Sequence, residues 1–373
     1  MARKAFWLLP LAGFLAACGD GGGGGEGEAP PPNVAFVVVT DFQTGSFATV
    51  SLDDFSVTRA SPERQVHSDA VVRVAGNRVY VVNRIFADNI QILDPEAGFA
   101  TVVQCSTGNG TNPHDILVLD GEKAYVTLYD TGKLLVVDPE PAPDCSDFVR
   151  GEIDLSAFAD ADGNPEPDQM AFVGGRVFVS IQRLDRNNFF VPAGAAALLE
   201  IDPEKDEVVA EITLGGRNPF ATTKGLVVQG GEIVVAETGQ FGVLDGGIER
   251  VQASTRMPEG FFVTEAELGG DINDFVLADG VGFAVVSAPD FTTSLVSFDT
   301  ATGQKLSTLL SGVSFLADIE LDGRGRLWVA DRTLESPGIR VFDAATGEEL
   351  TSGPLNLGLP PFEIVFVAAS GEG

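Results

Sequence analysis

The sequence predicts an all-β protein, a seven-bladed β-propeller with four-stranded antiparallel blades. Three observations lead to this prediction. One strand–turn–strand unit recurs along the chain. Short glycine-containing turns separate the first two strands of each unit, and such turns between apolar runs are the strongest hairpin signal in a sequence. Finally, each end of the chain holds only part of the unit, so the C-terminal strand can complete the first blade.

The first element in the chain is an export signal. Two basic residues precede the apolar stretch Ala5–Ala17, which is shorter than the roughly 20 apolar residues that span a bilayer. The stretch ends in Leu15-Ala16-Ala17-Cys18, which resembles the lipobox of bacterial lipoproteins. The resemblance implies that residues 1–17 are a signal peptide and that Cys18 is the site of lipid attachment. An ordinary signal peptide with a chance cysteine is the alternative.

Residues 18–33 are predicted to be a tether. Gly21–Gly25 is a polyglycine run and Glu26–Pro32 is acidic and proline-rich, a composition that cannot bury a core. An acylated Cys18 would anchor the chain in the cell envelope. Glycine rather than aspartate follows the cysteine, which implies the outer membrane by the sorting rule of that family. The propeller is then expected over residues 34–370.

Six complete units and one composite unit account for the seven blades. Each unit opens with a polar residue and a short apolar strand, followed by a glycine turn, a strongly β-prone strand, a loop, a third strand ending in aspartate, and a variable fourth strand. The unit is clearest at Asp69–Val74, Val79–Asn83 and Ile90–Asp94, with Gly76 in the turn. The first strands of the six complete units open at Asp69, His114, Asp168, Asn218, Asn273 and Asp318.

The two ends of the chain supply the composite blade. Residues 361–367 have the pattern of a first strand with no second strand after it, and residues 34–58 have the pattern of the missing three. Pairing the two ends closes the ring and covers edge strands that would otherwise invite association. We therefore also expect a monomer. The aromatic residues, 26 of them Phe, fall mostly at strand positions and are expected to pack between blades.

These repeats resemble the YVTN and NHL families of β-propellers over nearly all of residues 34–369. Val79–Asn83 and Ala124–Thr127 are close to the tetrapeptide that names the first family. Leu327–Asp331, followed by Ile339–Asp343, is similar to an NHL or SMP-30-like repeat. The resemblance implies the architecture but not one activity, because such propellers serve as binding platforms, lactonases, dehydrogenases and electron-transfer partners.

The strongly acidic composition limits the classes of partner. The 373 residues carry a net charge of −31, which argues against nucleic acid and against electrostatic docking on anionic lipid. A solvated acidic surface is the plain interpretation of this charge.

Two cysteines follow Cys18 in the sequence, and outside the cytoplasm Cys105 and Cys145 would tend to form a disulfide. The blade assignment puts Cys105 at the end of an outer strand and Cys145 in a loop before the next one. These points lie on opposite faces unless segment 139–147 folds back, so the sequence leaves this pairing open.

The candidate ligand site is the face where the first strands begin, because the starts of the innermost strands crowd around the channel. The loops Gln182–Gly194 and Glu237–Gly247 share this face. Carboxylates that converge there need a cation, a raised pKa or hydrogen-bond donors. The candidate ligand-binding residues are Asp69, His114, Asp115, Asp168, Asn218, Asp274, Asp318 and Glu363.

Two arrangements would neutralise these acids. In one, Ca²⁺ or another divalent cation takes oxygen ligands from them. In the other, which we favour, backbone N–H groups and nearby arginines satisfy them. The arginines expected on this face are Arg84, Arg183, Arg217 and Arg332.

The leading functional hypothesis is non-catalytic binding of an envelope protein, peptide or glycan through the channel face. The alternative is a metal-dependent hydrolase of the lactonase type, which the SMP-30-like resemblance implies, and a structural envelope protein without a small ligand is a third reading. No catalytic residue is predicted, because the chain has two histidines and lacks a haem-attachment or Gly-x-Ser-x-Gly motif. Residues of the type that hold the lactonase metal are Glu237, Asn218, Asp274 and Asp318, without a motif match.

Overall fold

The computed structural model describes residues 30–220 and 226–369. The predicted signal peptide (residues 1–17), the lipid-attachment residue Cys18 and most of the predicted tether (18–33) lie outside the described residues. In the described part of the chain, no helix is both long and apolar enough to cross a bilayer.

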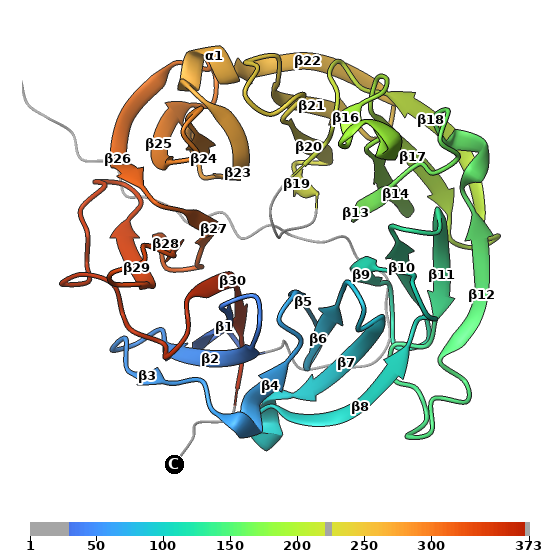
Figure 1. Cartoon of the computed structure of the whole chain (residues 1–373), viewed down its shortest axis with the longest axis horizontal. Coiled ribbons are helices and arrows are strands. Elements are labelled where there is room, and N and C mark those ends of the chain that lie inside the picture. Colours follow the sequence, from blue (N-terminus) through green and yellow to red (C-terminus); the bar gives the residue numbers. More distant parts are fainter. Residues whose placement is uncertain (1–29, 221–225, 370–373) are drawn as a thin grey trace, which may run out of the picture. The chain divides into compact units, whose positions relative to one another are not determined.

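Seven antiparallel sheets surround a central channel, as predicted (Figure 1). In every blade the first strand lines the channel, and the later strands lie progressively further out. Successive first strands contact each other at six of the seven junctions between blades, and at the junction of blades 5 and 6 the first strand of blade 6 contacts the second strand of blade 5.

The blades follow one another in chain order. Blade 1 contains β30 (Pro361–Val367), β1 (Val34–Thr40), β2 (Gly45–Ser51), β3 (Val57–Thr58) and β4 (Gln65–Val66). Blade 2 contains β5 (Ala70–Ala75), β6 (Arg78–Asn83), β7 (Asn89–Asp94) and β8 (Ala100–Ser106). Blade 3 contains β9 (Pro113–Val118), β10 (Ala124–Leu128), β11 (Lys133–Val137) and β12 (Val149–Asp154). Blade 4 contains β13 (Pro167–Val173), β14 (Arg176–Ile181), β17 (Ala197–Asp202) and β18 (Glu207–Thr213).

The remaining three blades complete the ring. Blade 5 contains β19 (Val227–Gln229), β20 (Glu232–Glu237), β21 (Gly247–Gln252) and β22 (Met257–Thr264). Blade 6 contains β23 (Asp271–Leu277), β24 (Val281–Ser287), β25 (Thr293–Asp299) and β26 (Lys305–Val313). Blade 7 contains β27 (Leu316–Leu321), β28 (Arg326–Asp331) and β29 (Gly338–Asp343), and two isolated bridges to β29 occupy its fourth position. A small hairpin, β15 (Leu184–Asp185) and β16 (Val191–Pro192), and the short helix α1 (Glu265–Leu268) lie in connections.

The predicted closure of the ring is confirmed. β30 pairs antiparallel with β1 from Val34↔Val367 to Val39↔Pro361, with one irregularity near the end (Figure 1). Asn33 extends the pairing: its side-chain Nδ2 donates to the Ala369 carbonyl at 2.8 Å, and its Oδ1 accepts from the Ala369 N–H at 2.8 Å. The C-terminal strand is therefore the innermost strand of the N-terminal blade.

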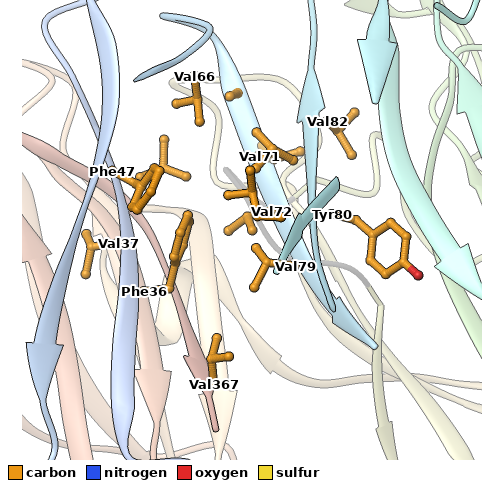
Figure 2. Packing of buried hydrophobic residues seen from close by; sticks show 14 of the residues in the cluster. Phe36, Val37, Phe47, Val66, Val71, Val72, Val79, Tyr80, Val82 and Val367 are labelled. Atoms are coloured by element: carbon orange, nitrogen blue, oxygen red, sulfur yellow. The ribbon is translucent and has the colours of Figure 1, made fainter. Parts of the chain in front are cut away.

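Apolar side chains pack between neighbouring blades, as the β-branched and aromatic strand positions predict. Between blades 1 and 2, the ring of Phe36 stacks on Phe47 at 4.6 Å and lies 5.2 Å from the ring of Phe99. Figure 2 shows Phe36 and Phe47 facing Val71 and the other valines of β5 and β6. This packing holds the blades together and positions the first strands around the channel.

Cys105 and Cys145 form a disulfide with Cα atoms 5.6 Å apart. Segment 139–147 folds back toward blade 2, because Asp138 N–H bonds to the Phe148 carbonyl at 2.8 Å and closes the loop at its base. The fold-back brings Cys145 beside the end of β8, which is the condition that the blade assignment required for this bond.

Candidate functional site

Seven of the eight predicted site residues lie at the beginnings of the first strands, on one face of the propeller. Asn218 is the exception: the strand predicted to open there is wrong, because β19 begins at Val227 and Asn218 only precedes an isolated bridge between Pro219 and Glu237. In blades 2, 3, 4 and 7 the residue after the second strand bonds to the residue before the first strand, for example Arg84 N–H to the Asp69 carbonyl at 2.9 Å and Arg332 N–H to the Phe315 carbonyl at 2.9 Å. The loops between second and third strands therefore share this end. We call it the loop face, formed by the first-strand starts and loops 41–44, 84–88, 129–132, 182–196, 238–246, 288–292 and 332–337.

Four of the acidic residues link neighbouring blades instead of opening toward the channel. Each carboxylate accepts a hydrogen bond from a backbone N–H in the first strand of the next blade, and all four side chains are buried. Such bonds satisfy buried amides and favour the charged form of the acid. The pairs are Asp115 with Met170, 2.8 Å; Asp274 with Ile319, 2.9 Å; Asp318 with Ile364, 2.7 Å; and Glu363 with Val72.

Arg73, on β5, bridges two of these carboxylates. Its Nε donates to Asp115 Oδ1 at 2.7 Å and its Nη1 donates to Glu363 Oε1 at 2.7 Å. Burial raises the pKa of Glu363 to about 8, against the opposing effect of the Arg73 charge. Burial likewise raises the pKa of Asp115, again with Arg73 opposing. One arginine of blade 2 thus joins blades 1 and 3 across the channel wall.

His114 and Asp168 form a pair in the mouth of the channel. His114 Nδ1 lies 3.0 Å from Asp168 Oδ1, and its ring stacks on Tyr129 with centroids 3.9 Å apart. Tyr129 donates to Gln182, which in turn donates to the other oxygen of Asp168 at 3.0 Å. Burial, and then the nearby charge of Asp168, raise the pKa of Tyr129 well above its usual value. This cluster brings together residues of blades 3 and 4.

The two other predicted residues hold loops. Asp69 accepts from the Arg84 side chain, with Nη2 at 2.5 Å, so it anchors loop 84–88. Asn218 donates from Nδ2 to the Gly239 carbonyl at 3.2 Å and so contacts loop 238–246.

Four arginines were expected to neutralise the acids, and within the part of the chain that the structure describes only Arg84 pairs with one of the predicted site residues. Arg183 pairs with Glu211, and Arg217 pairs with Asp245. Arg332 donates to backbone carbonyls.

The residue types proposed for a lactonase metal do not form a ligand set in the described chain. Residues 30–220 and 226–369 contain no group of three or more His, Cys, Asp or Glu side chains arranged to hold a metal. Glu237 is fully buried and accepts from the Gly216 N–H at 2.8 Å, and Asp274 and Asp318 accept from the next blade. These carboxylates are thus bonded to backbone N–H groups, whose partial positive charge repels a cation.

Glu237 also belongs to a buried acidic pair in blade 5. Burial, followed by hydrogen bonding to Glu249, raises the pKa of Glu237 to about 9. Glu249 accepts from the backbone N–H groups of Gly215 and Gly260, both at 2.8 Å. Backbone donors thus occupy both oxygens of Glu249, and Glu237 is the member of the pair whose pKa is raised.

The loop face carries a set of exposed apolar side chains, which we call the loop-tip crown. Six of the seven second-to-third-strand loops contribute at least one, and only the short blade 3 loop lacks it because Tyr129 there is covered. Exposure of the side chains ranges from 52% for Phe241 to 93% for Phe189. Soluble proteins seldom gather large apolar residues on one exposed face unless that face binds something. The crown consists of Phe42, Phe86, Phe189, Phe241, Phe291 and Leu334.

Four crown phenylalanines also have unfavourable backbone conformations. Phe42, Phe86, Phe189 and Phe291 have φ values between 56° and 67°. A left-handed backbone costs a residue with a Cβ about 1–2 kcal/mol, and glycine is the usual choice there. Each of these positions therefore combines a strained backbone with an apolar ring exposed to water. Both cost free energy, and such costs are a feature of surfaces maintained for binding.

The crown was not predicted from the sequence, because phenylalanine was expected mainly between blades. A usable signal was present in Asp41-Phe42 and Asp290-Phe291, where an aromatic residue directly follows a turn-forming aspartate in a predicted loop. Both aspartates accept backbone N–H bonds from residues just beyond the phenylalanine, which places Phe at the tip. Arg73 was missed because a mid-strand arginine carries no such signal.

Comparison with known proteins supports the fold but no family. No model of a protein family matches this sequence, and no curated protein matches it. Among solved structures, a functionally unknown protein from Desulfotomaculum acetoxidans is 12% identical, with a TM-score of 0.58 over 90% of this chain and 99% of that one. Dihydro-heme d1 dehydrogenase NirN in complex with DHE is 20% identical, with a TM-score of 0.57 over 91% of this chain and 76% of that one.

Hydrazine synthase from Kuenenia stuttgartiensis is a further match, 13% identical, with a TM-score of 0.54 over 75% of this chain and 78% of that one. At these identities the likeness shows the propeller fold alone. The resemblance to YVTN and NHL repeats and to lipoproteins stays a prediction from the sequence.

Proposed function

We propose that this propeller is a membrane-anchored, extracytoplasmic binding protein that captures a protein partner on its loop face. The observation that carries the proposal is the loop-tip crown. Its six side chains come from six blades, so they surround the channel mouth instead of lining one cleft. A ring of separate apolar anchors suits a large partner surface, since buried aromatic anchors dominate the binding energy of protein interfaces.

Charge defines the chemistry of the partner. The chain carries −31, so a partner surface with basic residues around its apolar contacts would be attracted, and an anionic bilayer would be repelled. Arginines already lie beneath part of the crown, with the Arg332 guanidinium 4.6 Å from the Phe42 ring centroid. We therefore assign the crown to a protein whose apolar patch has a basic rim.

The first strand of the chain begins at the end of the propeller opposite the loop face. β1 runs from Val34 to Thr40, and loop 41–44 with Phe42 follows at its far end. Asn33 therefore leaves the propeller at the end opposite the loop face. A lipid on Cys18 would hold the protein in the cell envelope, with the outer membrane as the predicted location.

Site-specific photo-crosslinking in cells that make the protein tests the proposal. A photoreactive residue is placed at Phe189 or at Phe291, and as a control at Met257, which is 60% exposed on the outer strand β22. We expect the same partner to be attached at both crown positions and not at Met257. Purified partner should then bind the Phe189→Ser/Phe291→Ser variant at least tenfold more weakly.

Two results would overturn the assignment. One is equal labelling at Met257 and at the crown, and the other is no discrete adduct at either crown position. The anchor is tested separately by labelling cells with a fatty-acid analogue, which should mark the wild-type protein and leave Cys18→Ala unmarked.

A further inference from the structure

A second surface, on the flank of the ring between blades 1 and 2, has a different chemistry. The outer edge of blade 1 consists of two-residue strands, β3 and β4, so sheet does not cover the outer half of the neighbouring blade face. A groove of about 470 Å³ remains there, between segment 62–67 and strands β6, β7 and β8. We call it the blade 1–2 groove. Its volume exceeds that of a single sugar ring.

Uncharged amide side chains form the walls of this groove. Glu63, at the exposed rim, is the one charged residue among the described lining residues, although 21% of the chain is charged. Amide groups offer donors and acceptors together, without a net charge. The lining side chains with hydrogen-bonding capacity are Gln65, His67, Asn83, Asn89, Gln91, Thr101 and Gln104.

A hydrogen-bond network fixes the orientation of these amides. Asn83 Nδ2 donates to Asn89 Oδ1 at 2.8 Å, and Gln104 Nε2 donates to the same oxygen at 2.8 Å. Gln91 Nε2 donates to Thr101 Oγ1 at 2.9 Å. A ligand that binds here meets groups whose rotamers are already set, so little side-chain freedom is lost on binding.

Only the inner amides of this network hold the two blades together. Asn83 and Gln91 are buried and tie blade 1 to blade 2: Asn83 Oδ1 accepts from the His67 N–H at 2.8 Å, and Gln91 donates to the Gln65 carbonyl at 3.3 Å. The side chain of Gln104 is exposed, and its one hydrogen bond within the described residues is to Asn89, inside the groove. The outer amides face solvent in a cavity, where a ligand can reach them.

We propose that the blade 1–2 groove binds a neutral saccharide. Each sugar hydroxyl both donates and accepts, which matches a row of amides, whereas a charged ligand would require a charged partner that the groove lacks. The acidic chain disfavours sialylated or uronic-acid ligands.

An array of immobilised neutral and acidic oligosaccharides, followed by calorimetry with the free sugars that bind, tests the proposal on the mature chain. The Gln104→Ala variant removes the exposed amide and leaves the buried ones in place, so the melting temperature should stay within a degree or two of wild type. We expect it to weaken neutral-saccharide binding at least tenfold. Gln229→Ala removes an exposed amide on β19 and should bind like wild type.

Three results would overturn the proposal: binding of acidic oligosaccharides alone, binding of no saccharide, or equal binding by wild type and Gln104→Ala. The outcome is independent of the loop-tip crown, because the Phe189→Ser/Phe291→Ser variant should keep full saccharide binding. Loss of binding in that variant together with retention in Gln104→Ala would assign the sugar to the loop face instead.

Discussion

At the scale of single residues, the crown phenylalanines combine an unfavourable backbone conformation with an exposed apolar side chain. Phe291 is 81% exposed and has φ of 64°, in loop 288–292 between β24 and β25. Glycine would make this turn without strain, so stability alone does not explain an aromatic residue. The position can therefore be tested without any knowledge of the partner.

Replacing Phe291 by glycine should give a more stable protein than replacing it by alanine, by about 1 kcal/mol, because only alanine keeps the strained Cβ. Urea denaturation of the two variants measures the difference. At Leu306, which is 55% exposed in the extended strand β26, the order should reverse and alanine should be the more stable. The same order at both positions would contradict strain at Phe291.

Glu237 predicts a pH dependence of stability. Its folded-state pKa of about 9 lies above the unfolded value of 4.5, so the folded protein holds a proton that the unfolded chain releases. Stability should therefore fall as pH rises from about 4.5 to about 9, by up to about 1.4 kcal/mol per pH unit, and the fall should end above the folded pKa.

Glu237→Gln keeps a donor toward Glu249 and an acceptor for Gly216 without the titration. Its stability relative to wild type should rise steadily between pH 5 and pH 9, as measured by denaturant unfolding at several pH values. A constant difference between the two proteins over this range would show that Glu237 is ionised in the folded state. Burial of this side chain could not be foreseen, because the sequence places it at a strand end where solvent is the default.

At the scale of the elements, the ring depends on charged contacts between first strands. Arg73 of β5 joins Glu363 of β30 to Asp115 of β9, and each of these carboxylates also accepts an N–H bond from a neighbouring blade. The sequence predicted that the acids would be satisfied by backbone N–H groups and arginines. The identity of the arginine depended on strand register, which the sequence pattern leaves undetermined.

Arg73→Met should destabilise the protein by about 3–5 kcal/mol at pH 8, because it leaves two buried carboxyl groups without their countercharge. Arg78→Met is the matched control in the next strand of the same blade, where the pair with Asp94 is partly exposed at 3.4 Å and should contribute less than about 1 kcal/mol. Equal effects of the two substitutions on the denaturation midpoint would argue against a special role for Arg73.

The elements themselves were predicted well where the local pattern is strong. Glycine turns such as Ala75-Gly76-Asn77 and apolar strands such as Val79–Asn83 determine hairpins from neighbouring residues alone. The outer strands were less predictable, as in blades 1 and 7, because they pack on one side only and a variable sequence suffices. The groove between blades 1 and 2 follows from such a reduced outer strand, so the sequence pattern did not predict it.

At the scale of the whole molecule, closure by the C-terminal strand is the condition for a complete ring. A chain that ends at Pro360 would lack β30, exposing the edge of β1 and the sides of β5 and β27 that pack on β30. We expect this truncated chain to lose its cooperative unfolding transition and to associate. A synthetic peptide of residues 360–369 added during refolding should restore a monomeric, cooperatively unfolding protein. A truncated chain that unfolds like the wild type would show that closure is dispensable.

The pairing of β1 has a mechanical consequence for a protein held by its N-terminus. Tension applied at Asn33 acts along β1, which has β30 on one side and β2 on the other. The hydrogen bonds of both ladders then share the load in shear, and none can open before the others. A pull on Asn33 would thus meet the blade in its strongest direction.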